Sequence, residues 1–337
     1  MTRVLIAGLI AMVISIVIGP KFIEFLRRNS LGQPIRAEGP AGHVVKQGTP
    51  VMGGLLILLC TVLPFLALSK YTLSAFTVLF VILGCGLIGF VDDFTKLRRR
   101  RSLGLPGRVK MVLLGAITVG VGFAVNRMDA LDNSIYVPIL DVDVPLSWAY
   151  YPFLFVVIAG AANGVNLTDG LDGLAAGTGI IALLTFTSIN VIAYIRSGPV
   201  GERSAVSLDL AILGAALIGG TIGFLWYNAF PAEVFMGDTG SMAIGGALAG
   251  FAIMTGTEAL LLLIGGIFVV EALSVMIQVF TFRYMGRRVF LMTPIHHHFE
   301  MKAWSETKIM VRFVIVAAIL CAVGFVLYYR YYLQFRL

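Results

Sequence analysis

Long apolar segments alternate with short polar ones along the whole chain. A membrane-spanning helix needs about 20 mostly apolar residues in a row, because the hydrocarbon core of a bilayer is about 30 Å thick. Ten segments fit this description, at roughly 4–26, 51–69, 73–91, 109–126, 147–163, 173–195, 208–227, 240–255, 257–282 and 310–329. The pattern predicts an all-α polytopic membrane bundle of about ten transmembrane helices, organised as a single integral membrane domain over residues 1–337.

The composition agrees with this pattern. Of the 337 residues, 58% are hydrophobic and 13% are charged, which is more apolar surface than a soluble domain can bury. Cys60, Cys85 and Cys321 all lie inside apolar segments, so we interpret them as small core residues, with neither a disulfide framework nor zinc-site spacing. No small-residue cleavage site is obvious after Arg3 and the apolar segment that follows it, so we expect a retained first span and not a removed signal peptide.

The basic residues set the predicted orientation. The net charge is +7, but Lys and Arg interrupt the apolar segments instead of covering one soluble face, which argues against nucleic acid as a partner. Most of the 25 Lys and Arg residues fall in the loops after odd-numbered segments, and cytoplasmic loops carry an excess of these residues. We therefore predict that both termini are periplasmic or extracellular. The outer loop 127–146 alternates apolar residues around a turn-like middle, which predicts a short β-hairpin.

Five dense polar motifs fall in the loops that are predicted to be cytoplasmic. They are "KQGTPVMGG" (46–54), "VDDFTK" (91–96), "NGVNLTDGLDG" (163–173), "NAFPAEVFMGDTGS" (228–241) and "TPIHHHFE" (293–300). The orientation was derived from Lys and Arg alone, so the gathering of these motifs on one face is an independent observation. It predicts one cytoplasmic active site.

Acidic residues are the first candidates for chemistry. Asp92 and Asp93 end an apolar segment, where an ionised carboxylate is costly unless it is paired or bound to a cation. On a helix they point about 100° apart, and Lys96 lies on the same face as Asp92. An interfacial capping cluster explains this pair equally well. Asp238 follows Gly237 in "MGDTGS", where glycine allows a sharp turn and close approach of a phosphate, although a helix N-cap is the alternative. Carboxylates gathered with glycines and lysines favour Mg²⁺.

The motif "NLTDGLDG" places Asn166, Asp169 and Asp172 among glycines. It reads either as a loop rich in turn-forming residues or as a pocket that recognises a base or a sugar. In the second interpretation Asp169 accepts a hydrogen bond from a pyrimidine N–H, and Phe235 stacks on the ring.

The three consecutive histidines of "TPIHHHFE" are unlike a metal site. On a helix their side chains fan out by about 100° each, and imidazole suits Zn, Cu, Fe or Ni better than Mg²⁺. Imidazoles can donate to phosphate and sugar oxygens, and a solvated interfacial turn is the alternative. Glu271 lies in the middle of the ninth apolar segment, so it is a candidate for function. A helix-packing role is equally compatible, because the sequence names no partner for it.

Together the five motifs, in this order, resemble the polyprenyl-phosphate N-acetylhexosamine-1-phosphate transferase superfamily. The likeness runs from Lys46 to Glu300, and the triple-histidine form of the last motif is similar to the muramoyl-pentapeptide branch. The resemblance implies an enzyme that transfers phospho-MurNAc-pentapeptide from UDP-MurNAc-pentapeptide to undecaprenyl phosphate. Its products would be lipid I and UMP. The resemblance also implies a need for Mg²⁺, a place in the bacterial plasma membrane and a homodimer.

The resemblance and the residue chemistry together suggest roles at the site. Asp238 would bind Mg²⁺, and Asp92 and Asp93 would lie at the reacting phosphates, as metal ligands or by handling the lipid phosphate. Three lysines would offset phosphate charge: Lys46, Lys96 and Lys110. The uridine end would be held by Asn163, Asn166, Asp169, Asn228 and Phe235, with Asp172 supporting that loop and Gly237 allowing close approach. His296, His297 and His298 would face the donor's diphosphate and sugar, with His297 foremost.

Three alternatives remain open at this point. A sister enzyme that transfers N-acetylglucosamine-1-phosphate to the same lipid would carry similar motifs. A secondary transporter would need essential ionisable groups at mid-membrane, where Glu271 is nearly alone. For the reaction itself, direct attack by the lipid phosphate and a two-step route through an aspartyl-phosphate are both compatible with the sequence.

Overall fold

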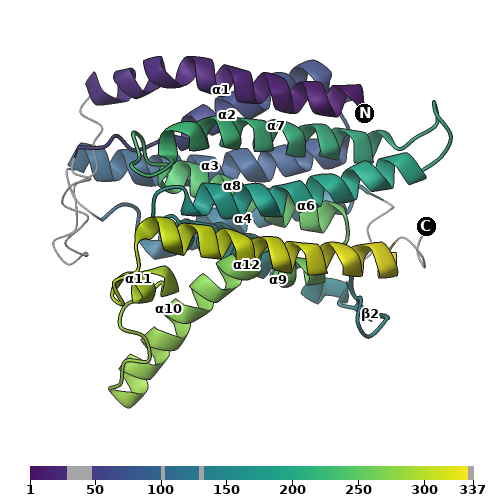
Figure 1. The fold of residues 1–337 in the computed structure, drawn as a ribbon. Coiled ribbons are helices and arrows are strands. Elements are labelled where there is room, and N and C mark those ends of the chain that lie inside the picture. The colour runs from purple at the N-terminus through teal and green to yellow at the C-terminus, as the bar shows by residue number, and fades with distance from the viewer. Residues whose placement is uncertain (29–47, 100–102, 129–132, 333–337) are drawn as a thin grey trace.

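A computed structural model describes residues 1–28, 48–99, 103–128 and 133–332, and these form an elongated bundle of helices (Figure 1). The long helices run side by side along the bundle. Their bounds are α1 Thr2–Arg28, α2 Gly54–Leu68, α3 Leu73–Arg99, α4 Gly107–Val125, α5 Tyr150–Thr168, α6 Leu174–Arg196, α7 Ala205–Asn228, α8 Gly237–Met254, α10 Gly266–Met285 and α12 Glu306–Leu327. Two short helices, α9 (Glu258–Ile264) and α11 (Ile295–Glu300), complete the main set.

The prediction of an all-α polytopic membrane protein is confirmed. Within the described ranges, eight helices are long and apolar enough to cross a membrane. Two more predicted segments correspond to α2, which has 15 residues, and α8, which has 18. Each of the ten predicted segments therefore contains a helix, while the number that crosses the bilayer stays a prediction.

Helix α8 forms the centre of the bundle. Every residue from Thr239 to Met254 is buried, as expected for a helix that is apolar all round. Its glycines and alanines let other backbones come close, which is how helices commonly pack in membranes. A Cβ on Gly54 would lie 2.1 Å from the backbone nitrogen of Gly240, and a Cβ on Gly245 would lie 2.3 Å from the carbonyl oxygen of Ala161. Helices α2 and α5 are thereby held tightly against α8.

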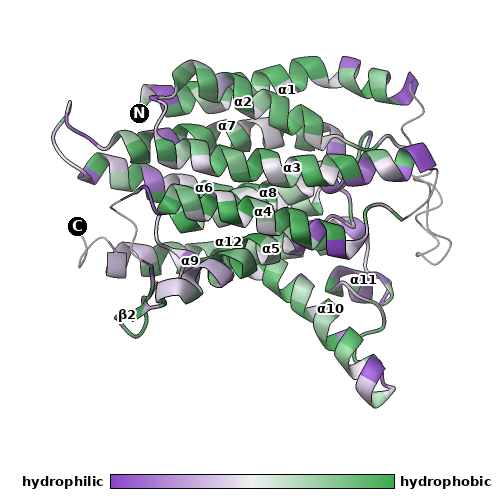
Figure 2. Ribbon diagram, turned by 180° about the vertical axis from the view of Figure 1, so that it is seen from behind, coloured by the Kyte–Doolittle hydropathy of each residue, from purple (hydrophilic) through white to green (hydrophobic). Residues whose placement is uncertain are grey.

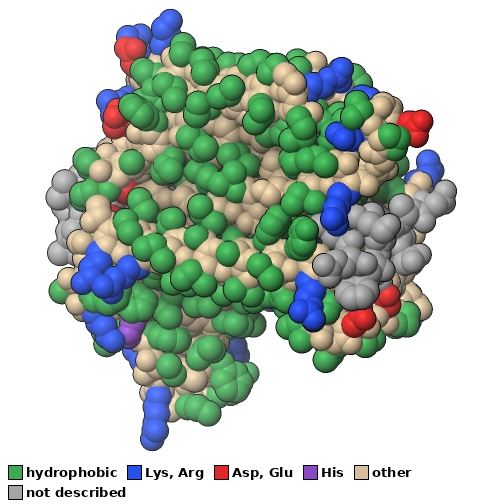
Figure 3. All heavy atoms as spheres, turned by 45° about the vertical axis from the view of Figure 1, so that its right-hand side comes forward, with side chains coloured by type: hydrophobic (Ala, Val, Ile, Leu, Met, Phe, Trp, Pro, Cys, Tyr) green, Lys and Arg blue, Asp and Glu red, His purple; other side chains and the backbone are tan. Residues whose placement is uncertain are grey.

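The surface has the distribution expected of a membrane protein. Apolar residues occupy the length of the helices in Figure 2, and hydrophilic residues gather toward the helix ends and loops. Hydrophobic side chains spread over the face shown in Figure 3, with Lys and Arg toward its edges. Large apolar side chains such as Val112, Phe123 and Trp226 are about 70% exposed. Their exposure would be costly in water, so a lipid surround accounts for it.

The hairpin predicted within 127–146 is present. Strand β1 (Ser134–Val137) pairs antiparallel with β2 (Val142–Pro145), with Val137 opposite Val142. The hairpin lies toward the end of the bundle that also holds both chain termini, whereas α11 lies toward the opposite end (Figure 1). The polar motifs and the termini are therefore at opposite ends of the bundle, as the charge pattern predicts.

The ninth predicted segment, 257–282, is not one helix. It divides at Gly265, which ends α9 and precedes α10, because two successive glycines at 265 and 266 weaken a continuous helix. Helix α10 then leaves the bundle at an angle (Figure 1). Its buried residues end at Ser274, so its second half projects beyond the neighbouring helices. Sequence periodicity did not predict this break.

Candidate active site

The packing of α3 against α8 brings three aspartates together.

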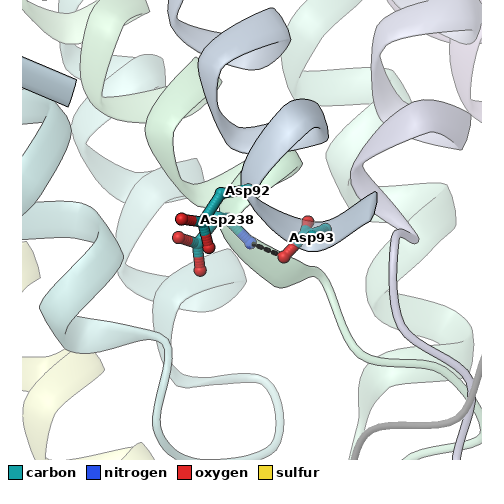
Figure 4. A group of neighbouring side chains, drawn as sticks. All are labelled: Asp92, Asp93 and Asp238. Carbon is teal, nitrogen blue, oxygen red and sulfur yellow. Dashed lines mark hydrogen bonds between the residues drawn. The ribbon is translucent and has the colours of Figure 1, made fainter. Parts of the chain in front are cut away.

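Asp92 and Asp93 lie near the end of α3, and Asp238 lies in the first turn of α8 (Figure 4). A Cβ on Gly89 would fall 2.1 Å from the carbonyl oxygen of Asp238. Glycine at 89 therefore lets the start of α8 lie directly against α3. This close packing explains how residues 145 positions apart come to share one site.

Asp92 and Asp238 share two lysines. The Lys96 ammonium lies 2.6 Å from Asp92 Oδ2 and 3.0 Å from Asp238 Oδ1. The Lys110 ammonium lies 3.0 Å from Asp92 Oδ1 and 2.7 Å from Asp238 Oδ2. Two carboxylates and two ammonium groups thus alternate in a closed ring. Lys96, on the same face of α3 as Asp92, pairs with it, and Lys110 joins the pair from α4.

Asp93 takes its hydrogen bonds from other residues, although the Lys96 ammonium also lies 3.9 Å from its Oδ1. Its Oδ2 accepts hydrogen bonds from the Thr239 backbone N–H at 2.9 Å and from the Thr239 hydroxyl at 2.7 Å. Its Oδ1 accepts a longer bond of 3.2 Å from the Asp238 N–H, drawn as the dashed line in Figure 4. The first N–H groups of a helix have no partner within the helix, so Asp93 caps the start of α8. It thereby fixes the position of Asp238.

The loop before α4 closes over Asp92. The Leu105 N–H donates to Asp92 Oδ1 at 2.7 Å, and a Cβ on Gly104 would fall 2.4 Å from the same oxygen. Asp92 is almost fully buried, whereas Asp238 keeps 15% of its side chain exposed. Of the two acids in the ring, Asp238 is the one more open to a ligand.

The three aspartates fit a divalent cation. They each offer an oxygen, and these oxygens lie within 4.8 Å of one another. Carboxylate oxygens are hard ligands of the kind that Mg²⁺ and Ca²⁺ prefer. Three carboxylates and two ammonium groups leave a net charge of about minus one at the site when all are ionised. A cation bound here would make the site attractive to phosphate.

The turn after α5 lies beside the aspartates. The pKa of Asp169 is raised to about 8, first by burial and then by the negative charges of Asp238 and Asp93. The backbone N–H of Gly237 donates to the Asp169 carboxylate and opposes this rise. Asn166, one turn earlier, donates to the Ser241 hydroxyl on α8 at 2.9 Å. Two of the residues predicted to hold the uridine end therefore lie against the start of α8.

Other predicted residues brace the loops around this turn. Asn228 accepts from the Gly173 N–H at 3.1 Å and donates to the Val234 carbonyl at 2.9 Å. Asp172 accepts from the Ala232 N–H at 3.0 Å. Both are buried. The predicted support role of Asp172 agrees with this contact, and Asn228 has the same kind of contact.

The fourth motif also meets the first. The Phe235 N–H donates to the Pro50 carbonyl at 2.8 Å, and the Phe235 carbonyl accepts from Gly53 at 2.9 Å. Phe235 itself is partly buried.

Asn163 is partly buried too, and its amide donates to the Ala159 carbonyl within α5. Lys46 lies outside the described residues.

The three histidines have three different environments on α11. His296 is fully buried and lies 3.0 Å from Glu271 through Nδ1. His297 pairs with Glu300, and His298 accepts from the Leu291 N–H at 3.1 Å. The pKa of His298 is lowered, first by burial and then by the charge of Lys302. The three imidazoles therefore have separate partners.

Several contributors to the site had no signal in the sequence. Thr239 holds Asp93, Leu105 holds Asp92, and His296 is the partner that the sequence could not name for Glu271. Each contact joins residues from different elements, so neither the spacing of the two residues in the sequence nor their residue types predict it.

Comparison with known proteins relates the part of the chain that carries this site to a protein family. The family model described as Glycosyl transferase family 4 matches residues 75–256, which include all three aspartates. The phospho-N-acetylmuramoyl-pentapeptide-transferase of Desulfitobacterium hafniense is 44% identical over 323 residues, covering 95% of this chain and 96% of the relative. The chain belongs to the phospho-N-acetylmuramoyl-pentapeptide-transferase family.

Further relatives extend this result over the whole chain. The transferase of Rubrobacter xylanophilus is 44% identical and covers 98% of both chains. That of Halalkalibacterium halodurans is 45% identical and covers 92% of this chain and 93% of the relative. The resemblance inferred from the five motifs is therefore confirmed, and the protein is a membrane phosphoglycosyl transferase of this family.

Proposed function

We propose that this protein transfers phospho-MurNAc-pentapeptide from UDP-MurNAc-pentapeptide to undecaprenyl phosphate, giving lipid I and UMP, with Mg²⁺ as cofactor. The observation that carries the proposal is the ring of Asp92, Asp238, Lys96 and Lys110 at one end of an apolar bundle. Such a ring combines cation ligands with phosphate-binding ammonium groups. The membership of the family supplies the substrate class.

The reaction exchanges one diphosphate bond for another. An oxygen of the lipid phosphate attacks the β-phosphorus of the donor, a P–O bond forms, and the P–O bond to UMP breaks. UMP leaves with the electron pair of that bond. The second pKa of a phosphate monoester is about 6, so the lipid phosphate is already largely ionised at pH 7. Charge neutralisation and in-line positioning are therefore the main requirements.

The lysines and aspartates fit these requirements. Asp238 and Asp92 would hold Mg²⁺, with Asp93 fixing the start of α8 or supplying a further ligand. When bound, the ion neutralises phosphate charge and orients the diphosphate. Lys96 and Lys110 neutralise the aspartates in the structure, and with a cation held by the carboxylates they would be free to contact phosphate oxygens. Their flexible stems and point charges suit such contacts.

The contacts of Asp92 bear on the choice between direct attack by the lipid phosphate and a two-step route through an aspartyl-phosphate. Both of its carboxylate oxygens are close to an ammonium group, and Oδ1 also accepts from Leu105. A carboxylate held in this way is a poor nucleophile, which supports direct attack by the lipid phosphate. A radiolabelled phospho-enzyme formed from donor alone would contradict the direct route.

The donor's uridine end would lie at the turn formed by Asn166 and Asp169, close to Phe235. Asn163 would extend this surface, while Asp172 and Asn228 would hold the turn in place through their contacts to Ala232 and Gly173. Gly237 has a φ of +73°, and a Cβ there would fall 2.6 Å from Asp93. A glycine at this position lets the chain turn beside the phosphates.

We further propose that the site faces the cytoplasm of a bacterial inner membrane and that the protein acts as a homodimer. The donor is water-soluble, so the polar end of the bundle must face an aqueous compartment. Excess Lys and Arg at this end supports the same orientation. The isoprenoid tail would lie in the bilayer against the apolar helices.

The proposal is tested by UMP release from UDP-MurNAc-pentapeptide by the purified protein. We expect release only when undecaprenyl phosphate and Mg²⁺ are both present. UDP-N-acetylglucosamine, offered in place of the donor, should give no release. Release from that sugar, but not from the pentapeptide donor, would contradict the proposal and assign the sister reaction.

A further inference from the structure

Glu271 and His296 form a buried polar pair that joins α10 to α11. Both side chains are fully buried, and His296 Nδ1 lies 3.0 Å from Glu271 Oε1. Within the part of the chain that the structure describes, Glu271 Oε2 and His296 Nε2 have no hydrogen-bond partner. The single bond between the two residues is therefore what offsets their burial, and the loss of either residue would leave the other buried and unpaired.

His296 also supports the turn that carries Asp169. A Cβ on Gly170 would fall 2.3 Å from His296 Nε2, so the imidazole lies directly against the Gly170 backbone. The neighbouring Asp169 accepts from the Gly237 N–H, next to Asp238. A continuous set of contacts thus runs from α10 through the imidazole to the start of α8.

The same face of α10 holds the segment before α11. Gln278 is seven residues after Glu271, two turns along the same face. Its Oε1 accepts from the N–H groups of Val289 and Phe290, both at 3.0 Å, and its amide donates to the Phe290 carbonyl at 2.9 Å. Helix α10 therefore fixes the chain on both sides of the turn that leads into α11.

We propose that Glu271 and His296 are a positioning pair that sets α11 and the Asp169–Gly170 turn against Asp238. This inference rests on the proposed function, and it gives His296 a role different from donor contact. His296 has no exposed surface, and its free nitrogen faces Gly170. His297 and His298, which both keep part of their surface exposed, are left as the histidines that the pair presents to the donor.

A double-mutant cycle tests this role. Glu271→Met and His296→Phe each leave one polar group buried and unpaired, and each should lower kcat by about 10- to 100-fold, since a shift of about 1 Å can cost that much. The double variant restores an apolar, similarly sized pair, so its kcat should exceed that of either single variant. A histidine that contacts the donor would not be rescued in this way.

Two further variants keep the test decisive if the single variants fold poorly. Glu271→Gln retains an acceptor for His296 and should keep kcat within about threefold of the wild type. Asp209→Asn alters another fully buried acid, which accepts from Ser69, Lys70 and Thr72 toward the opposite end of the bundle. It should lower the unfolding temperature and leave kcat unchanged.

Amide hydrogen exchange of residues 169–173 and 291–300 gives a readout without turnover. Exchange should rise in both single variants and fall again in the double variant. Losses in kcat that multiply in the double variant, or an equal loss of kcat in Asp209→Asn, would overturn the positioning role. Absence of UMP release by the wild type would instead count against the proposed function, and exchange would still test the pair.

Discussion

Asp92 and Asp93 are neighbours in the sequence, but their carboxylates have different partners. Asp92 lies between Lys96 and Lys110, whereas Asp93 caps α8 through Thr239. The 100° step of a helix predicted that the two need not face one site. The sequence could not say which acid faces which way, because Lys110 and Thr239 come from other helices. The Glu271–His296 pair was hidden for the same reason.

Asp238 is the residue whose change should be most costly to activity. We expect Asp238→Asn to lower kcat by more than about 100-fold, since even residues that only support a metal ligand cost 10- to 100-fold. The protein should remain folded, because Asp93 binds the backbone of α8 and not the Asp238 side chain. UMP release and thermal unfolding in detergent measure the two effects. Near-normal turnover by this variant would refute the metal assignment.

Substitution of Gly237 should lower both stability and activity, for two separate reasons. Its φ of +73° costs a residue with a Cβ about 1–2 kcal/mol, and that Cβ would lie 2.6 Å from Asp93 Oδ2. We therefore expect Gly237→Ala to lose both stability and kcat. Gly256 has a similar φ of +61° but no atom within 4 Å of its Cβ position. Gly256→Ala should lose stability alone, and equal kcat values for the two variants would contradict this reasoning.

At the scale of elements, the apolar segments predicted helices well and predicted their interruptions poorly. Each expected segment contains a helix because burial in lipid leaves the backbone few alternatives. The departure of α10 from the bundle after Gly265 depends on its packing against α5 and α12. Hydrophobicity along the chain does not encode that packing, since lipid and protein both accept apolar side chains.

The contact between α2 and α8 should tolerate no added atom. A Cβ on Gly54 would lie 2.1 Å from the Gly240 nitrogen, which is backbone and cannot move aside cheaply. Gly54→Ala should therefore lower the unfolding temperature and the yield of folded protein. Gly160, on α5, has open space at its Cβ position, so Gly160→Ala should be neutral or stabilise by about 0.5–1 kcal/mol. Equal unfolding temperatures for the two variants would contradict the close packing.

At the scale of the whole molecule, the charge pattern predicted one feature that no single motif shows. It placed the polar motifs at one end and both termini at the other, and the structure has this arrangement (Figure 1). The sequence predicted that the five motifs lie at one end of the bundle, because successive helices run in opposite directions. It did not predict the distances between the motif residues or their hydrogen-bond partners, because these depend on how far each helix tilts and where it ends.

The orientation in the membrane can be measured by thiol labelling. The three native cysteines are buried, so background labelling should be low. A cysteine in place of Ile139, which is 69% exposed on the hairpin, should react with an impermeant reagent in intact cells. A cysteine in place of Leu103, 75% exposed near Asp92, should react only after the membrane is opened. The reverse pattern would place the active site outside the cell.

The proposed binding of a divalent cation by Asp238 and Asp92 places that ion where the two phosphates meet. Its most direct test is the position of Mn²⁺, which replaces Mg²⁺ and scatters X-rays anomalously, in crystals grown with UMP. We predict one peak at about 2.0–2.2 Å from carboxylate oxygens of these two residues, with Lys96 and Lys110 turned away from them. A peak elsewhere, or none at these aspartates while UMP is bound, would contradict the account.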